Sequence, residues 1–136
     1  MNAALVVDAS VAATWLFDDE DDPRATAALA ELEAVPGWVP QLWHFEMRNI
    51  LLVACRRQRI TSAGAKERLV ALVDLPLETD HEPGLDAAFA LAAKHGLTFY
   101  DALYLELALR RRARIATLDA ALLRAARDEG SAVIGP

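Results

Sequence analysis

The sequence of 136 residues has one cysteine, two lysines and no long apolar run. A single cysteine, Cys55, cannot form an internal disulfide, so we expect it to be a small core residue in a cytosolic protein. No apolar run approaches the roughly 20 residues of a membrane span. The first ten residues carry no basic segment before their apolar run, which favours a buried strand over a signal peptide. We therefore expect no membrane anchor.

Positive charge is also in short supply, because 14 lysines and arginines stand against 20 acidic residues and leave a net charge of −6. Such a surface is poorly suited to broad, non-specific binding of nucleic acid. The arginines nevertheless fall in two clusters, which either complement the C-terminal ends of helices or contact phosphate groups. The clusters are Arg56, Arg57 and Arg59, and Arg110, Arg111, Arg112 and Arg114.

Hydrophobic residues make up 54% of the chain, which is enough for a full core in one domain spanning 1–136. Ser10 is expected to cap the first helix, Pro23 and Pro83 to open two others, and Gly96 to end one. Short apolar segments alternate with helical patterns, which predicts an α/β fold: a three-layer α/β/α domain around a parallel sheet of about four to five strands. Strands are expected at 4–7, 38–39, 114–117 and 131–134, with a strand or extended link at 75–79, and helices at 10–17, 23–34, 42–58, 61–74, 83–95, 100–111 and 119–130.

Four acidic residues lie where these strands end or helices begin: Asp8, Glu46, Asp101 and Asp119. Their neighbours are mostly apolar, and a buried carboxylate is costly to keep charged unless a cation meets it. Each acid also has a local explanation. Asp8 suits an Asx turn, Asp119 an N-cap, Asp101 the first turn of a helix, and Glu46 an ion pair on a helix surface.

One shared explanation is more economical than four separate ones. Ligand sites of parallel sheets lie beyond the carboxyl ends of the strands, where all four acids could converge. A divalent metal would relieve their repulsion, and a metal held by carboxylates suits phosphate chemistry. Ser10, Asn49 and Thr117 lie within three residues of these acids. They either orient the carboxylates or make ordinary capping and core hydrogen bonds.

Other acidic α/β folds fit this pattern less well. A haloacid-dehalogenase-like phosphatase needs a second Asp two residues after the first, where this chain has Ser10. A receiver domain needs an acidic pair near the first strand and a lysine after a late strand, and neither Lys66 nor Lys94 is so placed. A dinucleotide-binding domain needs a glycine-rich turn, which the sequence lacks.

Four motifs, in order, resemble those of the PIN-domain family, and most closely those of its VapC-type toxins. VVDASV contains Asp8, and FEMRNIL contains Glu46 and Asn49. LTFYDALYLELA, the most specific stretch, contains Asp101, and ATLDAALLRAA contains Thr117 and Asp119. The resemblance runs nearly end to end, and no acidic position of the family pattern is missing.

The resemblance implies an endoribonuclease that depends on Mg²⁺ or Mn²⁺ and leaves 5′-phosphate and 3′-hydroxyl ends on RNA. Asp8, Glu46, Asp101 and Asp119 would hold one or two ions, and Ser10, Asn49 and Thr117 would support them. It also implies a homodimer that is silenced by a small VapB-like antitoxin, whose C-terminal segment lies along a groove formed by early helices. The choice of RNA would depend on surface shape and loops rather than on these motifs.

Two further questions stay open at the level of sequence. The same motifs are compatible with a PIN-like module that binds RNA or a protein partner without cleaving it. Phe99 and Tyr100 are expected to pack in the core rather than stack on bases. Trp15, Phe17 and Trp43 either belong to the core or line a groove for the partner.

Overall fold

The computed structural model describes residues 4–134, and its centre is a four-stranded parallel sheet. The strand order is β3-β2-β1-β4, so β1 lies inside the sheet and is completely buried, as expected of a parallel strand covered on both faces. This confirms the three-layer α/β/α fold predicted from the sequence. The strands are β1 (Leu5–Val7), β2 (Gly37–Pro40), β3 (Leu77–Asp80) and β4 (Arg114–Ala116).

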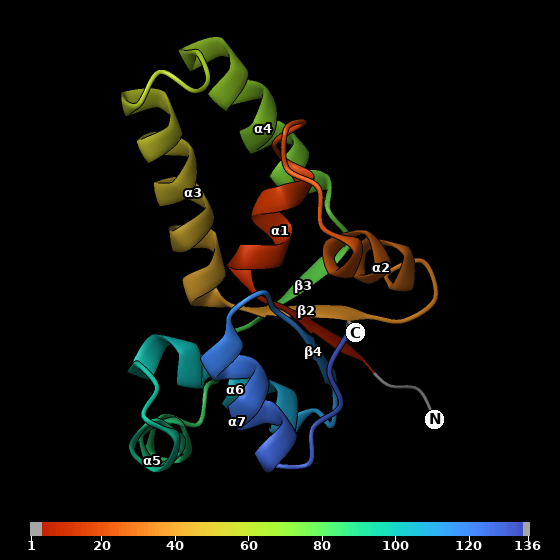
Figure 1. Cartoon of the computed structure of the whole chain (residues 1–136), viewed down its shortest axis with the longest axis vertical. Coiled ribbons are helices and arrows are strands. Elements are labelled where there is room, and N and C mark those ends of the chain that lie inside the picture. Colours follow the sequence, from red (N-terminus) through yellow and green to blue (C-terminus); the bar gives the residue numbers. More distant parts are fainter. Residues whose placement is uncertain (1–3, 135–136) are drawn as a thin grey trace.

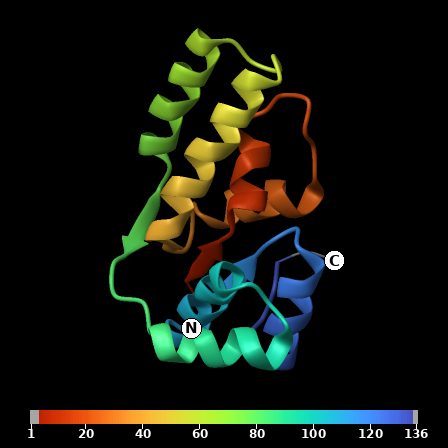
Figure 2. The same ribbon diagram turned by 90° about the vertical axis from the view of Figure 1, so that its left-hand side faces the viewer.

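Seven helices in residues 4–134 cover the two faces of the sheet, with α1 to α4 on one side and α5 to α7 on the other (Figures 1 and 2). The α3 and α4 helices project together away from the sheet (Figure 1). None of the described helices is both long and apolar enough to cross a membrane. The helices are α1 (Ala9–Trp15), α2 (Pro23–Glu31), α3 (Gln41–Arg56), α4 (Ser62–Asp74), α5 (Leu85–His95), α6 (Phe99–Arg110) and α7 (Ala120–Asp128).

Three predicted element ends are wrong, for local reasons. Ser10 does not cap α1, because the chain turns into the helix directly after β1 and Asp8 takes the N-cap position. Pro83 lies before α5, which begins at Leu85 with Gly84 as its N-cap. Residues 131–134 form a single parallel bridge, from Val133 to Ile115, rather than a fifth strand. Gly96 ends α5 as predicted, with the left-handed φ of 65° that glycine tolerates.

The early aromatic residues belong to the core. Trp43 and Phe17 are buried, and the Trp15 indole donates a hydrogen bond to the carbonyl of Ala25 at 2.9 Å. The Arg59 guanidinium covers the ring of Phe17 at 4.0 Å. The alternative that these rings line an open partner groove is therefore wrong.

Phe99 and Tyr100, at the start of α6, behave differently from the prediction. Tyr100 is 60% exposed and Phe99 is partly buried, so core packing is wrong for Tyr100. The first turn of α6 leads away from the sheet, and Tyr100 points outward while Asp101 and Tyr104 follow on other faces of the helix.

Most of the clustered arginines stabilise the fold through ion pairs. Arg59 pairs with Asp19 and Glu20, in the acidic loop after α1, and Arg114 pairs with Glu31. For these arginines an ion pair replaces the expected interaction with a helix dipole. Arg56, Arg57 and Arg112 are exposed, and no ion pair of theirs is found within residues 4–134.

A buried ionic network joins the end of β3 to α6. Arg110 donates to both oxygens of Asp80 at 2.9 Å and to Glu106 at 2.7 Å. Asp80 and Glu106 are only 4% and 5% exposed. Arg111 also contacts Asp80 at 3.2 Å and stacks over Trp38 at 3.4 Å, so the network anchors the edge of the sheet.

Candidate metal centre

Asp8 is held at the carboxyl end of β1, beside the end of β4. Its backbone N–H donates to the carbonyl of Ala116 at 2.9 Å, which fixes the two strand ends together. Its side chain is buried, and Oδ2 accepts hydrogen bonds from Ser10 Oγ at 2.8 Å and Thr117 Oγ1 at 2.6 Å. The two hydroxyls therefore set the orientation of this carboxylate without adding charge.

Asp119 joins the same network through the loop after β4. Its backbone N–H donates to Thr117 Oγ1 at 3.0 Å, and its carboxylate oxygen Oδ1 caps α7 by accepting from the N–H of Leu122 at 2.9 Å. Ser10 Oγ accepts from the N–H of Leu118 at 3.0 Å. Because each hydroxyl accepts a backbone N–H, its own proton is directed to Asp8. The N-cap explanation of Asp119 is correct, and it does not compete with a position at the acidic rim.

Glu46 and Asp101 reach the rim from two helices. Glu46 lies in the second turn of α3, which follows β2 directly, and its Oε1 accepts a hydrogen bond from the Tyr104 hydroxyl at 2.5 Å. Asp101 lies in the first turn of α6, where its backbone N–H is capped by Thr98 Oγ1 at 3.0 Å. The sequence analysis missed Tyr104, although its position three residues after Asp101 indicates the same helix face.

The electrostatics show that the four acids lie in one another's fields. Burial raises the pKa of Asp8, and the charge of Asp119 raises it further. Burial also raises the pKa of Glu46, with added repulsion from Asp8 and Asp101. The pKa of Asp101 is raised by burial and then by Asp119 and Asp8. A cation at this rim would relieve desolvation and repulsion together.

The donor set fits a hard divalent cation, but the side chains are not closed around one. Within residues 4–134, no three Asp, Glu, His or Cys side chains are close enough to form a ready metal site. Mg²⁺ keeps several of its waters and binds proteins through few direct carboxylates. Carboxylates that surround a rim without touching are therefore suited to a partly hydrated ion.

Asn49 and His44 contribute little to the rim as the structure stands. Asn49 is exposed one turn after Glu46, and its side chain makes no hydrogen bond to the four acids in the described structure. His44 Nε2 lies 2.7 Å from Thr79 Oγ1, which links α3 to β3. A structural contact therefore accounts for His44.

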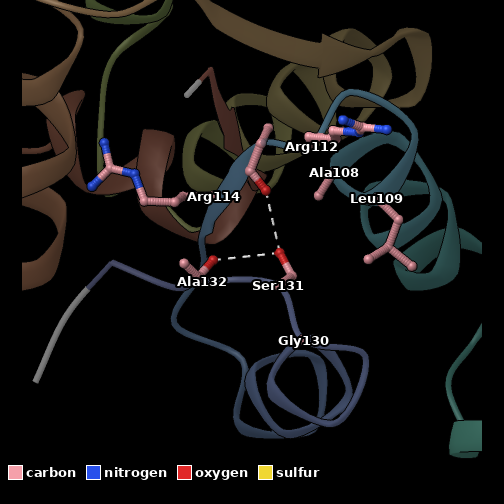
Figure 3. Close-up of a pocket in the computed structure, with 8 residues that line it drawn as sticks. Ala108, Leu109, Arg112, Arg114, Gly130, Ser131 and Ala132 are labelled. Carbon is pink, nitrogen blue, oxygen red and sulfur yellow. Dashed lines mark hydrogen bonds between the residues drawn. The ribbon is translucent and has the colours of Figure 1, made fainter. Parts of the chain in front are cut away.

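Two hollows outside the rim are distinct from the acidic cluster. A pocket of about 460 Å³ is lined by the turn before β4 and the segment after α7, where Arg112, Arg114 and Ser131 lie around it (Figure 3). It lies at the end of β4 where the strand begins, whereas Asp119 follows the strand's other end. A second, apolar groove of about 280 Å³ runs between α3 and α6 and includes Phe45 and Tyr100, the residues directly before Glu46 and Asp101.

The pKa shifts give an expected pH dependence for the metal-free protein. Between the usual carboxyl pKa near 4 and the raised values, the folded state binds more protons than the unfolded state. The contribution of these groups to stability therefore falls as pH rises through that window. We expect Asp8→Asn to stabilise the metal-free protein relative to wild type more at pH 7 than at pH 4. Thermal unfolding in EDTA at both pH values measures this, and an equal or smaller advantage at pH 7 would contradict it.

These features define an α/β protein with an acidic site at the carboxyl edge of a parallel sheet. The model of the PIN domain matches residues 5–128. The chain belongs to the PIN-domain family, as the four motifs suggested.

Named relatives are consistent with that family. The chain is 34% identical over 119 residues to Ribonuclease VapC3 of Pyrobaculum aerophilum, covering 85% of this chain and 88% of the relative. Among solved structures, PAE2754 from Pyrobaculum aerophilum matches with a TM-score of 0.74 and 24% identity, over 96% of this chain and 89% of that one. A toxin-antitoxin complex from Klebsiella pneumoniae matches with a TM-score of 0.55 and 17% identity, over 84% of this chain and 83% of that one. The two structural matches indicate the fold.

Proposed function

We propose that this protein is an endoribonuclease that uses Mg²⁺ or Mn²⁺ and acts as the toxin of a toxin–antitoxin pair. The observation that carries the proposal is the acidic rim. Asp8 is buried and held by two hydroxyls, and its charge is felt by both Glu46 and Asp101. The 34% identity to a protein named a ribonuclease supports RNA as the substrate. We place the protein in the cytosol, where RNA is available.

Each residue has a distinct part in the proposed reaction. Asp8, Glu46, Asp101 and Asp119 would hold the ion directly or through waters, with Ser10 and Thr117 fixing Asp8 and Asn49 available to the outer water shell. A bound divalent ion polarises the phosphate and makes water a better nucleophile. The chain itself supplies the orientation of the carboxylates and the partly buried setting in which their charge acts strongly.

Cleavage of RNA by the purified protein tests this proposal. We expect total RNA to be cut in the presence of Mn²⁺ or Mg²⁺, to remain intact in EDTA, and to yield fragments with 5′-phosphate ends. Asp101→Asn should remove cleavage and leave the circular dichroism spectrum unchanged. If wild type binds RNA but leaves it intact with either ion, the protein is a binding module rather than a nuclease.

We propose a small antitoxin as the natural partner. A likeness to a protein solved as a toxin-antitoxin complex supports this idea. The projecting α3–α4 pair exposes apolar side chains, including Leu52, Val70 and Val73, that would suit a peptide with an apolar face. Expression of the chain alone should arrest growth, and co-expression of the small protein encoded beside it should restore growth. Normal growth on expression would contradict the toxin role and leave nuclease activity open.

A homodimer is the second assembly that we propose, formed through the groove between α3 and α6. Phe45 and Tyr100 are about 60% exposed there. Leu85 and Phe89, one turn apart on α5, are exposed as well, and α5 packs on α6. We expect Phe45→Glu to convert a dimer to a monomer in sedimentation velocity, whereas Val73→Glu, on α4, should leave the dimer intact. A wild-type monomer at micromolar concentration would contradict the assignment.

A further inference from the structure

A buried tyrosine hydroxyl points at the acidic rim and is not explained by core packing alone. Tyr104 lies in the second turn of α6 and is completely buried. Its ring packs in the hydrophobic core, and its hydroxyl donates to Glu46 Oε1 at 2.5 Å. A phenylalanine would fill the same space, so the hydroxyl adds a polar contact that packing does not require.

The hydroxyl lies between two of the four acids. The backbone N–H of Ala9, the residue after Asp8, interacts with both the Asp8 carboxylate and the Tyr104 hydroxyl. Tyr104 also lies one helical turn after Asp101, on the same face of α6. One side chain therefore links the first residue of α1, the second turn of α3 and the helix that carries Asp101.

We propose that Tyr104 is a positioning residue that holds the Glu46 carboxylate in the orientation needed to bind the divalent ion. The proposal rests on the proposed metal-dependent function. Glu46 has three side-chain torsions and no cationic partner in the described structure, so Oε1 is fixed only by this hydrogen bond. A neutral donor fixes one oxygen, leaves Oε2 for the ion or its waters, and brings no positive charge that would compete with the metal.

The first test is the Mn²⁺ affinity of Tyr104→Phe, which removes only the hydroxyl. We expect the dissociation constant for Mn²⁺, measured by electron paramagnetic resonance of the free ion, to rise about tenfold, as is typical when a residue supporting a ligand is lost. The circular dichroism spectrum should stay unchanged. Tyr100→Phe is the matched control, because it removes an exposed hydroxyl from the same helix and should leave the affinity unchanged.

A double variant separates positioning from folding. In the Glu46→Gln background the ligand has lost its charge, so adding Tyr104→Phe should change Mn²⁺ affinity by less than about twofold. If Tyr104→Phe alone fails to fold because Glu46 loses its partner, the double variant should fold again. A full tenfold loss in both backgrounds, or failure of both to fold, would overturn the positioning role in favour of a packing role.

The outcomes also separate this inference from the proposed function. Wild-type affinity in Tyr104→Phe overturns the role of Tyr104 and leaves the metal-dependent nuclease standing. Absence of Mn²⁺ binding by wild type at millimolar concentration overturns both. A selective loss in Tyr104→Phe, absent in Tyr100→Phe and in the Glu46→Gln background, supports the role of Tyr104.

Discussion

Replacing Asp8 by asparagine is expected to reduce RNA cleavage by more than about 100-fold and to leave the protein folded. Loss of a residue that merely supports a metal ligand costs about 10–100-fold, and Asp8 is proposed as a ligand itself. The asparagine oxygen can still accept from Ser10 and Thr117, so the local hydrogen bonds survive. Removing the charge also removes a buried carboxylate whose pKa is raised by burial, so the metal-free variant should be no less stable than wild type.

Cleavage assays with matched variants measure this effect. Asp128→Asn, at the exposed end of α7, changes net charge by the same amount and should cut RNA like wild type. Mn²⁺ should raise the unfolding temperature of wild type and of Asp128→Asn, and should have little effect on Asp8→Asn. Retention of more than a tenth of wild-type cleavage by Asp8→Asn would count against its assignment as a ligand.

Arg110→Ala is expected to have the largest effect on stability. It leaves two buried carboxylates, Asp80 and Glu106, without their main partner. Breaking a buried ion pair on one side typically costs about 3–5 kcal/mol. Arg110 is one-third exposed, so water replaces part of the interaction and we expect about 2–3 kcal/mol.

Urea unfolding of two control variants makes the second prediction specific. Arg110→Lys should recover only part of the loss, because an ammonium cannot donate to both Asp80 oxygens as the guanidinium does. Lys94→Ala, which removes a mostly exposed partner of Glu129, should change the free energy of unfolding little. A loss for Arg110→Ala no larger than that for Lys94→Ala would show that water already compensates the network.

The sequence predicted the fold well because its signals are local. Helix caps such as Thr61, Thr98 and Asp119 act within three residues, and Gly96 marks a helix end by its own backbone freedom. Ser10 was misassigned because a serine near a helix start suits either a cap or the first turn. Only the contact between Asp8 and Thr117, 109 residues apart, decides between them.

Contacts between distant segments explain what the sequence did not reveal at the site. The four acids could be listed from their motifs, but the pairing of Glu46 with Tyr104 joins residues 58 positions apart on two helices. The exposure of Tyr100 has the same origin, because an apolar neighbourhood in sequence says nothing about which way the first turn of α6 faces. The arginine clusters were likewise ambiguous until Asp80 and Glu31 were placed beside them.

A crystal of the protein soaked in Mn²⁺ tests the central claim most directly. An anomalous difference map should show one or two strong peaks between Asp8, Glu46, Asp101 and Asp119, with carboxylate or water oxygens at about 2.1–2.2 Å from the ion. The same map from Asp8→Asn crystals should lose the peak nearest residue 8. A saturating soak that places Mn²⁺ elsewhere, or leaves this rim without a peak, would contradict a shared metal site.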